Sequence, residues 1–219
     1  MRKTVFTAYF AVLVLAAAAL CRPGPAFADQ EMTPVPLAFA SEPSGSTIFT
    51  MMPPRLGTDY KVVREGYGIA YRVDRDGALK EIYRTQGWYS FKVHVSADGR
   101  YLVQMGPWNR GIKPEKDHLA VAFHKDGKLL KRYSTVDLIK DPSKVKSSVS
   151  HYMWLQPDYA DDLSEIEIQG LAPHIDYDNC FTLHTIDGWT YVFDVTTGNI
   201  KRSHLTRQPK APPENPTRK

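Results

Sequence analysis

The chain has 219 residues, of which 42% are hydrophobic, and its 28 basic and 24 acidic side chains give a formal net charge of +4. Residues 1–28 and 203–219 hold seven of the basic residues and one acidic residue, so residues 29–202 carry 21 basic against 23 acidic side chains. The basic balance therefore belongs to the two ends of the chain. It gives no support to nucleic-acid binding by the domain between them.

The first 28 residues have the pattern of a secretory signal peptide. Residues 2–3 are basic, residues 5–20 are apolar but short for a membrane span, and residues 26–28 read Ala-Phe-Ala, a typical cleavage pattern. We expect cleavage after Ala28 and a periplasmic or extracellular protein with no membrane span once the signal is removed. An uncleaved membrane anchor and a lipoprotein modified at Cys21 are the alternatives.

Residues 29–43 are polar and contain prolines, which predicts a linker. Residues 44–205 are dense in short β-branched and aromatic runs, which predicts a single β domain. Asp-Gly pairs, which favour the tight turns of β-hairpins, separate these runs at 76–77, 98–99, 126–127 and 187–188. Cys180 is the sole cysteine after signal removal, so no internal disulfide is available and a hydrophobic core must hold the domain.

One helix and a tail complete the predicted elements. Residues 134–137 (Ser-Thr-Val-Asp) have the character of a capping box and predict a short helix over 135–140, which Pro142 ends. Residues 206–219 include four prolines, which predicts a disordered tail.

Two segments resemble repeats of bacterial β-propellers. Residues 96–103 (Ser-Ala-Asp-Gly-Arg-Tyr-Leu-Val) resemble the turn of TolB-like blades, and residues 192–200 resemble the blade ending of quinoprotein and YVTN-type propellers. The resemblance implies blade-like hairpins and carries no function. The Asp-Gly turns are spaced irregularly, whereas propeller blades repeat about every 40–45 residues. We therefore expect a mainly β fold of antiparallel hairpins, stacked as a partial propeller-like or sandwich domain with one short helix.

The candidate binding residues are aromatic and polar side chains near strand ends. Residues 147–154 follow the predicted helix and combine hydroxyls, an imidazole and two aromatic rings, which is the chemistry of a polar ligand site. The candidate ligand-binding residues are Ser150, His151, Tyr152, Trp154, Trp88 and Trp108. In the alternative interpretation the aromatic rings belong to the core of a strand and the serines cap a turn.

A metal site is a further hypothesis. His174, Asp176, Asp178 and His184 would share one face of a strand, because side chains alternate along it, and imidazole and carboxylate are transition-metal ligands. Alternatively, a turn around Asn179 interrupts the strand and separates them. We expect no cofactor.

No segment has the pattern of a catalytic motif, since Ser150 lies outside any nucleophile elbow. We therefore expect an exported, non-enzymatic β domain that binds a protein, a glycan or a small ligand. A periplasmic hydrolase using Ser150 or His151, or a metal-binding protein, is the alternative, and a structural role in an envelope assembly is a third possibility.

Overall fold

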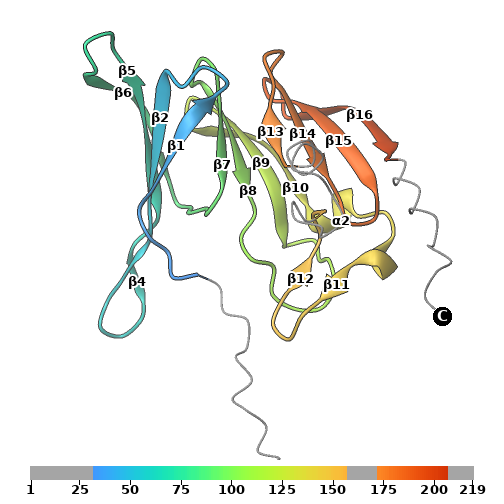
Figure 1. Cartoon of the computed structure of the whole chain (residues 1–219). Coiled ribbons are helices and arrows are strands. Elements are labelled where there is room, and N and C mark those ends of the chain that lie inside the picture. The colour runs from blue at the N-terminus through green and yellow to red at the C-terminus, as the bar shows by residue number, and fades with distance from the viewer. Residues whose placement is uncertain (1–31, 157–171, 207–219) are drawn as a thin grey trace, which may run out of the picture. The chain divides into compact units, whose positions relative to one another are not determined.

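A computed structural model describes residues 32–156 and 172–206 of the chain. Contacts divide the chain into residues 1–30 and 31–219, and every described residue belongs to the second unit. This unit consists mostly of strands, and its described residues form one short α-helix (Figure 1). The predicted mainly β fold with one short helix is confirmed. The predicted signal peptide, and the predicted tail apart from Thr206, lie outside the described residues.

The largest sheet has eight strands in the order β10-β9-β8-β7-β1-β2-β5-β6. Its strands are β1 (Leu37–Glu42), β2 (Thr47–Met52), β5 (Tyr67–Val73), β6 (Leu79–Gln86), β7 (Val93–Ser96), β8 (Tyr101–Met105), β9 (Leu119–Lys125) and β10 (Lys128–Ser134). A second sheet is a four-stranded antiparallel meander of β13 (His174–Ile175), β14 (Cys180–His184), β15 (Trp189–Asp194) and β16 (Asn199–Leu205). Two small hairpins complete the strands: β3 (Arg55–Leu56) with β4 (Val62–Arg64), and β11 (Lys146–Ser147) with β12 (Tyr152–Met153).

Strand β1 joins two sets of hairpins into the large sheet. It pairs antiparallel with β2 on one side and, through Ser41 and Glu42, parallel with β7 on the other. This strand lies within residues 29–43, which the sequence analysis assigns to a linker. The prolines at 36 and 43 flank its apolar residues and obscure the strand pattern.

The eight-stranded sheet curls so that strands distant in its order approach one another. The hydroxyl of Tyr83 in β6 donates a hydrogen bond of 2.7 Å to the carbonyl of Gly99 in the β7–β8 turn. A Cβ atom added at Gly127, in the β9–β10 turn, would run into the carbonyl oxygen of Arg84 in β6. Gly127 also has a φ of +80°, so both its conformation and the close approach of β6 favour glycine there.

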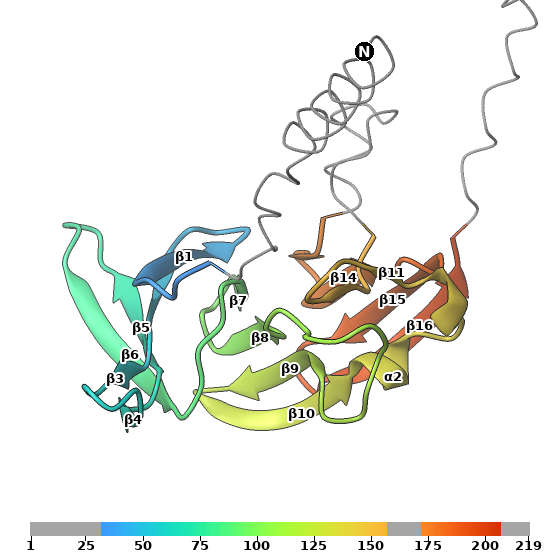
Figure 2. The same cartoon turned by 90° about the horizontal axis from the view of Figure 1, so that it is seen from below.

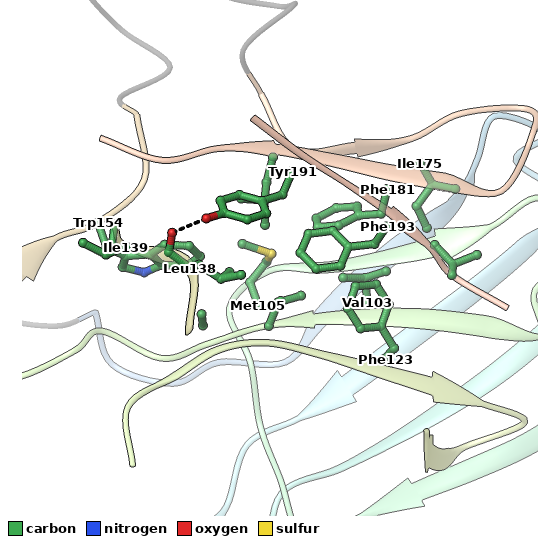
Figure 3. Close-up of a cluster of buried hydrophobic side chains, with 14 of the residues drawn as sticks. Val103, Met105, Phe123, Leu138, Ile139, Trp154, Ile175, Phe181, Tyr191 and Phe193 are labelled. Atoms are coloured by element: carbon green, nitrogen blue, oxygen red, sulfur yellow. Dashed lines mark hydrogen bonds between the residues drawn. The ribbon is translucent and has the colours of Figure 1, made fainter. Parts of the chain in front are cut away.

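The four-stranded sheet packs against the β8–β10 side of the curled sheet. Phe123 of β9, Phe181 of β14 and Phe193 of β15 meet there with ring centroids 5.1–6.3 Å apart, and all three are fully buried. Figure 3 shows these rings together with the hydrogen bond of 2.5 Å from the Tyr191 hydroxyl to the carbonyl of Leu138. This core therefore joins residues from both sheets with residues that follow β10.

A second core lies inside the curl of the large sheet. Trp88 stacks on Phe49 and on His124, with centroid distances of 6.1 and 5.1 Å. His124 is buried, and its Nε2 lies 3.0 Å from Oε1 of Gln104. Burial lowers the pKa of His124 to about 4, so this imidazole is neutral near pH 7.

Glu42 links the two sheets. One carboxylate oxygen lies 2.9 Å from Nδ1 of His94 in β7, and the other accepts a hydrogen bond of 2.9 Å from the backbone N–H of Ile175 in β13. The His94 ring lies against Phe181, with centroids 5.1 Å apart. A single carboxylate therefore connects β1, β7 and β13.

The helix α2 (Thr135–Leu138) begins as the sequence predicts. Ser134 is its N-cap, and Asp137 completes the capping box by accepting hydrogen bonds from the backbone N–H and the hydroxyl of Ser134. The helix ends at Leu138, earlier than the predicted Lys140. No helix in residues 32–156 and 172–206 has the length and apolar character needed to cross a membrane.

One edge strand of each of the two larger sheets is basic. Strand β10 carries Lys128, Lys131 and Arg132, strand β16 carries Lys201 and Arg202, and neither strand contains an acidic residue. Charged edge strands discourage the addition of a further strand. Extension of either sheet at β10 or β16 is therefore disfavoured.

Candidate functional site

The aromatic residues of the predicted ligand segment lie in the core. Tyr152 and Trp154 are 2% and 7% exposed and pack with the residues of both sheets. The Tyr152 hydroxyl is hydrogen-bonded to Thr135 and lies 2.9 Å from Nδ1 of His118. These two rings therefore help to hold the fold. Trp88, which is farthest in the sequence from residues 150–154, packs against the second core beside Phe49 and His124.

The rest of the predicted set is brought together around one turn. His151 is half-buried, and its ring meets the ring of Trp108 edge to face with centroids 4.0 Å apart. Ser150 is half-buried in the same turn. Ligand binding at Trp108, Ser150 and His151 stays a prediction.

The hydroxyl of Ser148, a residue outside the predicted set, approaches His151. The Ser148 Oγ lies 2.6 Å from Nδ1 of His151, and the Ser148 backbone N–H donates to the His151 carbonyl. A serine within hydrogen-bond reach of a histidine is the minimal arrangement for nucleophile activation. Here both groups belong to one four-residue turn, and their hydrogen bond also stabilises that turn.

Three of the four predicted metal ligands, His174, Asp176 and His184, make separate side-chain contacts. Nδ1 of His174 lies near the carbonyl of Ala172, and Nδ1 of His184 near the Thr190 hydroxyl. The carboxylate of Asp176 accepts backbone hydrogen bonds within the β13–β14 turn, where Asn179 has a φ of +56°. The turn at Asn179 therefore separates the predicted ligands along the chain.

A different set of potential ligands lies close together. Among the described residues, Glu115, Asp117 and His118 are the group whose ligand atoms all lie within 4.8 Å of one another. Both carboxylates are exposed, and Nδ1 of His118 is already engaged with Tyr152. The contact with Tyr152 therefore competes with metal binding at Nδ1 of His118.

Four exposed apolar side chains gather on the β3–β4 hairpin, residues 55–64, for which the sequence predicts no site. Leu56, Tyr60, Val62 and Val63 are 52%, 85%, 50% and 54% exposed. In Figure 1 the hairpin extends away from the curled sheet. Apolar side chains gathered on an exposed element are typical of an interaction site.

The turn of this hairpin places Tyr60 in an unfavourable backbone conformation. The backbone N–H of Gly57 donates to the Lys61 carbonyl, and the N–H of Tyr60 donates to the Gly57 carbonyl. These hydrogen bonds close a short loop in which Tyr60 has a φ of +60°. Hairpin loops of this kind usually place glycine or asparagine in the left-handed region, because a larger side chain is strained there.

The charges of the hairpin are unevenly paired. Asp59 lies 3.2 Å from the Lys61 ammonium, and hydrogen bonds from Lys61 lower the pKa of the Asp59 carboxyl. Arg55 and Arg64 stand opposite each other across the two strands. Within the described residues neither arginine forms an ion pair with a carboxylate, although Arg64 lies over the ring of Tyr67 at 4.9 Å.

Figure 2, seen from below, shows this hairpin beside β5 and β6 and apart from the four-stranded sheet. The hairpin residues are exposed apart from Gly57, which is half-buried. Their side chains are therefore available to a partner without opening either core.

The sequence matches no protein-family model, and a comparison with curated proteins finds no relative.

Proposed function

We propose that this chain is an exported, non-enzymatic β domain that binds a partner, and that the β3–β4 hairpin is its contact element. The export part of the proposal depends on the signal-peptide pattern of residues 1–28. N-terminal sequencing of the protein recovered outside the cytoplasm should begin at Asp29. An intact Met1 on that protein would refute cleavage.

One observation carries the binding proposal: Tyr60 is at once strained and exposed. A left-handed conformation costs a residue with a side chain about 1–2 kcal/mol, and 85% exposure means that the ring gains little from burial. Such conformations cluster at binding and switch sites. Contact with a partner would offset the cost that the free protein bears.

A photo-crosslinking amino acid at position 60 tests the proposal in the cells that produce the protein. Position 177 offers a matched control, since Tyr177 is 84% exposed but lies in the β13–β14 turn. We expect a discrete crosslinked product from position 60 and none from position 177. Equal products from both positions, or no product from position 60, would refute the hairpin as the contact element.

A hydrolase is a second candidate, favoured by the approach of Ser148 to His151. A serine-reactive fluorophosphonate probe tests this candidate. Labelling of the protein that disappears in Ser148→Ala would support a hydrolase, and labelling unchanged by that substitution would exclude Ser148 as the nucleophile.

We also propose that the likeness to propeller blades is limited to single hairpins and to the β13–β16 meander. A four-stranded antiparallel meander is the architecture of one blade. Strands β1 and β7 pair in parallel within the larger sheet, which a meander does not contain.

A further inference from the structure

We infer that the β3–β4 hairpin binds the surface of an anionic phospholipid bilayer. The inference rests on the proposed function, because it names the partner of the same hairpin. It follows from the charges of the hairpin, from its exposed apolar side chains and from its dimensions.

The charges favour an anionic partner. Residues 55–64 contain three basic side chains and one carboxylate. The Asp59–Lys61 pair is internally neutral, which leaves Arg55 and Arg64 facing each other without a counterion from the described residues. Like charges directly opposite each other on paired strands repel. A phosphate group would relieve this repulsion, since guanidinium groups bind phosphate oxygens in a bidentate manner.

The exposed apolar side chains favour a partner that has an apolar region beside its anionic groups. Leu56 and Val62 are cross-strand partners that lie one position beyond Arg55 and two positions before Arg64, and Tyr60 lies in the loop. Tyrosine is enriched where membranes meet water, because its ring is apolar and its hydroxyl is polar. The hairpin therefore presents arginines at its base and, farther out, apolar side chains around the Asp59–Lys61 pair.

The dimensions match the depth of a bilayer interface. A strand rises about 3.3 Å per residue, so the loop extends roughly 10 Å beyond the arginine pair. Interfacial segments bury their apolar side chains about 5–10 Å into the boundary between headgroups and acyl chains. With the arginines at the phosphates, Leu56 and Val62 lie about 3–7 Å deeper and Tyr60 about 10 Å deeper, so the three side chains span this range. The exposed Asp59–Lys61 pair at the tip limits the hairpin to shallow insertion.

A bilayer fits this hairpin better than a folded protein partner does. A stable protein interface uses about 20–30 residues on each side, whereas the hairpin offers ten. Residues 55, 56 and 58–64 are all exposed, so the hairpin presents a projecting ribbon rather than a flat patch. A fluid bilayer surface can surround such a ribbon.

Vesicle sedimentation of the protein, as purified from the cells that make it, tests the inference. We expect at least fivefold more binding to vesicles of 70% phosphatidylcholine and 30% phosphatidylglycerol than to phosphatidylcholine alone. The pair Arg55→Gln with Arg64→Gln should lose most of this difference. The pair Leu56→Ser with Tyr60→Ser should lose binding to a similar extent. All variants share the same N-terminus, so any contribution that it makes to vesicle binding cancels.

The neighbouring β5–β6 hairpin supplies matched controls. Arg72 and Lys80 also stand opposite each other, and Leu79 is 56% exposed. The pair Arg72→Gln with Lys80→Gln, and Leu79→Ser alone, should bind within twofold of the wild type. All variants should have the same Tm as the wild type, because none of the substituted residues belongs to either core.

Equal binding to both kinds of vesicle, or equal losses in the β3–β4 and β5–β6 variants, would overturn the inference. If vesicle binding fails but position 60 crosslinks to a protein, the lipid inference is wrong and the proposed function stands. If position 60 crosslinks to nothing as well, both proposals fail.

Discussion

Removing the carboxylate of Glu42 should loosen the connection between the two sheets. In Glu42→Ala, the backbone N–H of Ile175 and the Nδ1 atom of His94 both lose their partner. A buried polar group left without a partner costs about 1–3 kcal/mol. The Glu42 side chain is 36% exposed, so water can replace part of the loss. We therefore expect the free energy of unfolding to fall by about 2 kcal/mol. For a domain of this size, that loss lowers the Tm by about 4–8 °C.

The pH dependence gives this prediction a second readout. Burial alone would raise the pKa of Glu42, but the hydrogen bonds from His94 and Ile175 outweigh it and hold the pKa below its ordinary value of 4.5. The stabilisation is therefore complete above the pKa of the unfolded chain and is lost as the pH falls through the lower folded value. The stability difference between wild type and Glu42→Gln should be large at pH 7 and should shrink below pH 4.

Urea denaturation followed by tryptophan fluorescence measures both effects. Glu81→Ala is the control, since Glu81 also forms a short ion pair, with Arg84, but on the exposed surface of β6. The urea midpoint of Glu81→Ala should lie near that of the wild type. A wild-type midpoint for Glu42→Ala would contradict the role of Glu42. So would a loss of unfolding free energy in Glu42→Gln that is the same at pH 3.5 and pH 7.

Three further predictions concern the turns and the two cores. Gly127→Val should cost at least 1 kcal/mol more than Gly77→Val in chemical denaturation, because both glycines have positive φ but a Cβ atom meets a carbonyl only at 127; equal losses would contradict the close approach of β6. Trp154→Ala should cost about 3–5 kcal/mol and His151→Ala much less, whereas a small loss at Trp154 would show that its ring is not part of the core. Burial holds His124 neutral down to a pKa of about 4, against 6.5 in the unfolded chain, so its contribution to stability is full above pH 6.5 and falls as the pH drops toward 4; His124→Phe should flatten that slope, and an unchanged slope would exclude this histidine.

Local features of the fold are those that the sequence predicts best. Positive φ at Gly77, Gly99, Gly127 and Gly188 confirms the four Asp-Gly turns. The capping box of α2 is equally local, since it involves residues three positions apart. Such features depend on the conformational preferences of neighbouring residues, which the sequence states directly.

The assembly of the hairpins into sheets depends on distant contacts. The parallel pairing of β1 with β7 joins residues more than 50 positions apart, and no local pattern encodes it. The link from Glu42 to Ile175 spans 133 positions. The sequence therefore predicts hairpins but neither their order nor the curl of the large sheet.

The candidate site divides in the same way. Tyr152 and Trp154 follow a turn, which suggests a loop, yet the sheets close over them and bury both rings. Leu56, Val62 and Val63 have the composition of a buried strand, yet their hairpin extends away from the sheet. Burial is decided by tertiary contacts. The sequence therefore leaves Tyr152 and Trp154 open between a ligand site and a core strand, and it makes no prediction of a site at residues 55–64.

The separation of the β3–β4 hairpin from both cores determines how its residues are to be interpreted. A stability of about 5–15 kcal/mol tolerates the 1–2 kcal/mol that a left-handed tyrosine costs. Tolerance does not explain why tyrosine stands at position 60, because glycine would adopt the same φ without strain and the exposed ring gains little from folding. Folding thus favours a smaller residue there. Under the proposed function, contacts made outside the chain account together for the tyrosine and for the two arginines at the base of the hairpin, which lack a carboxylate partner among the described residues. Binding and stability should then respond to different substitutions in this protein.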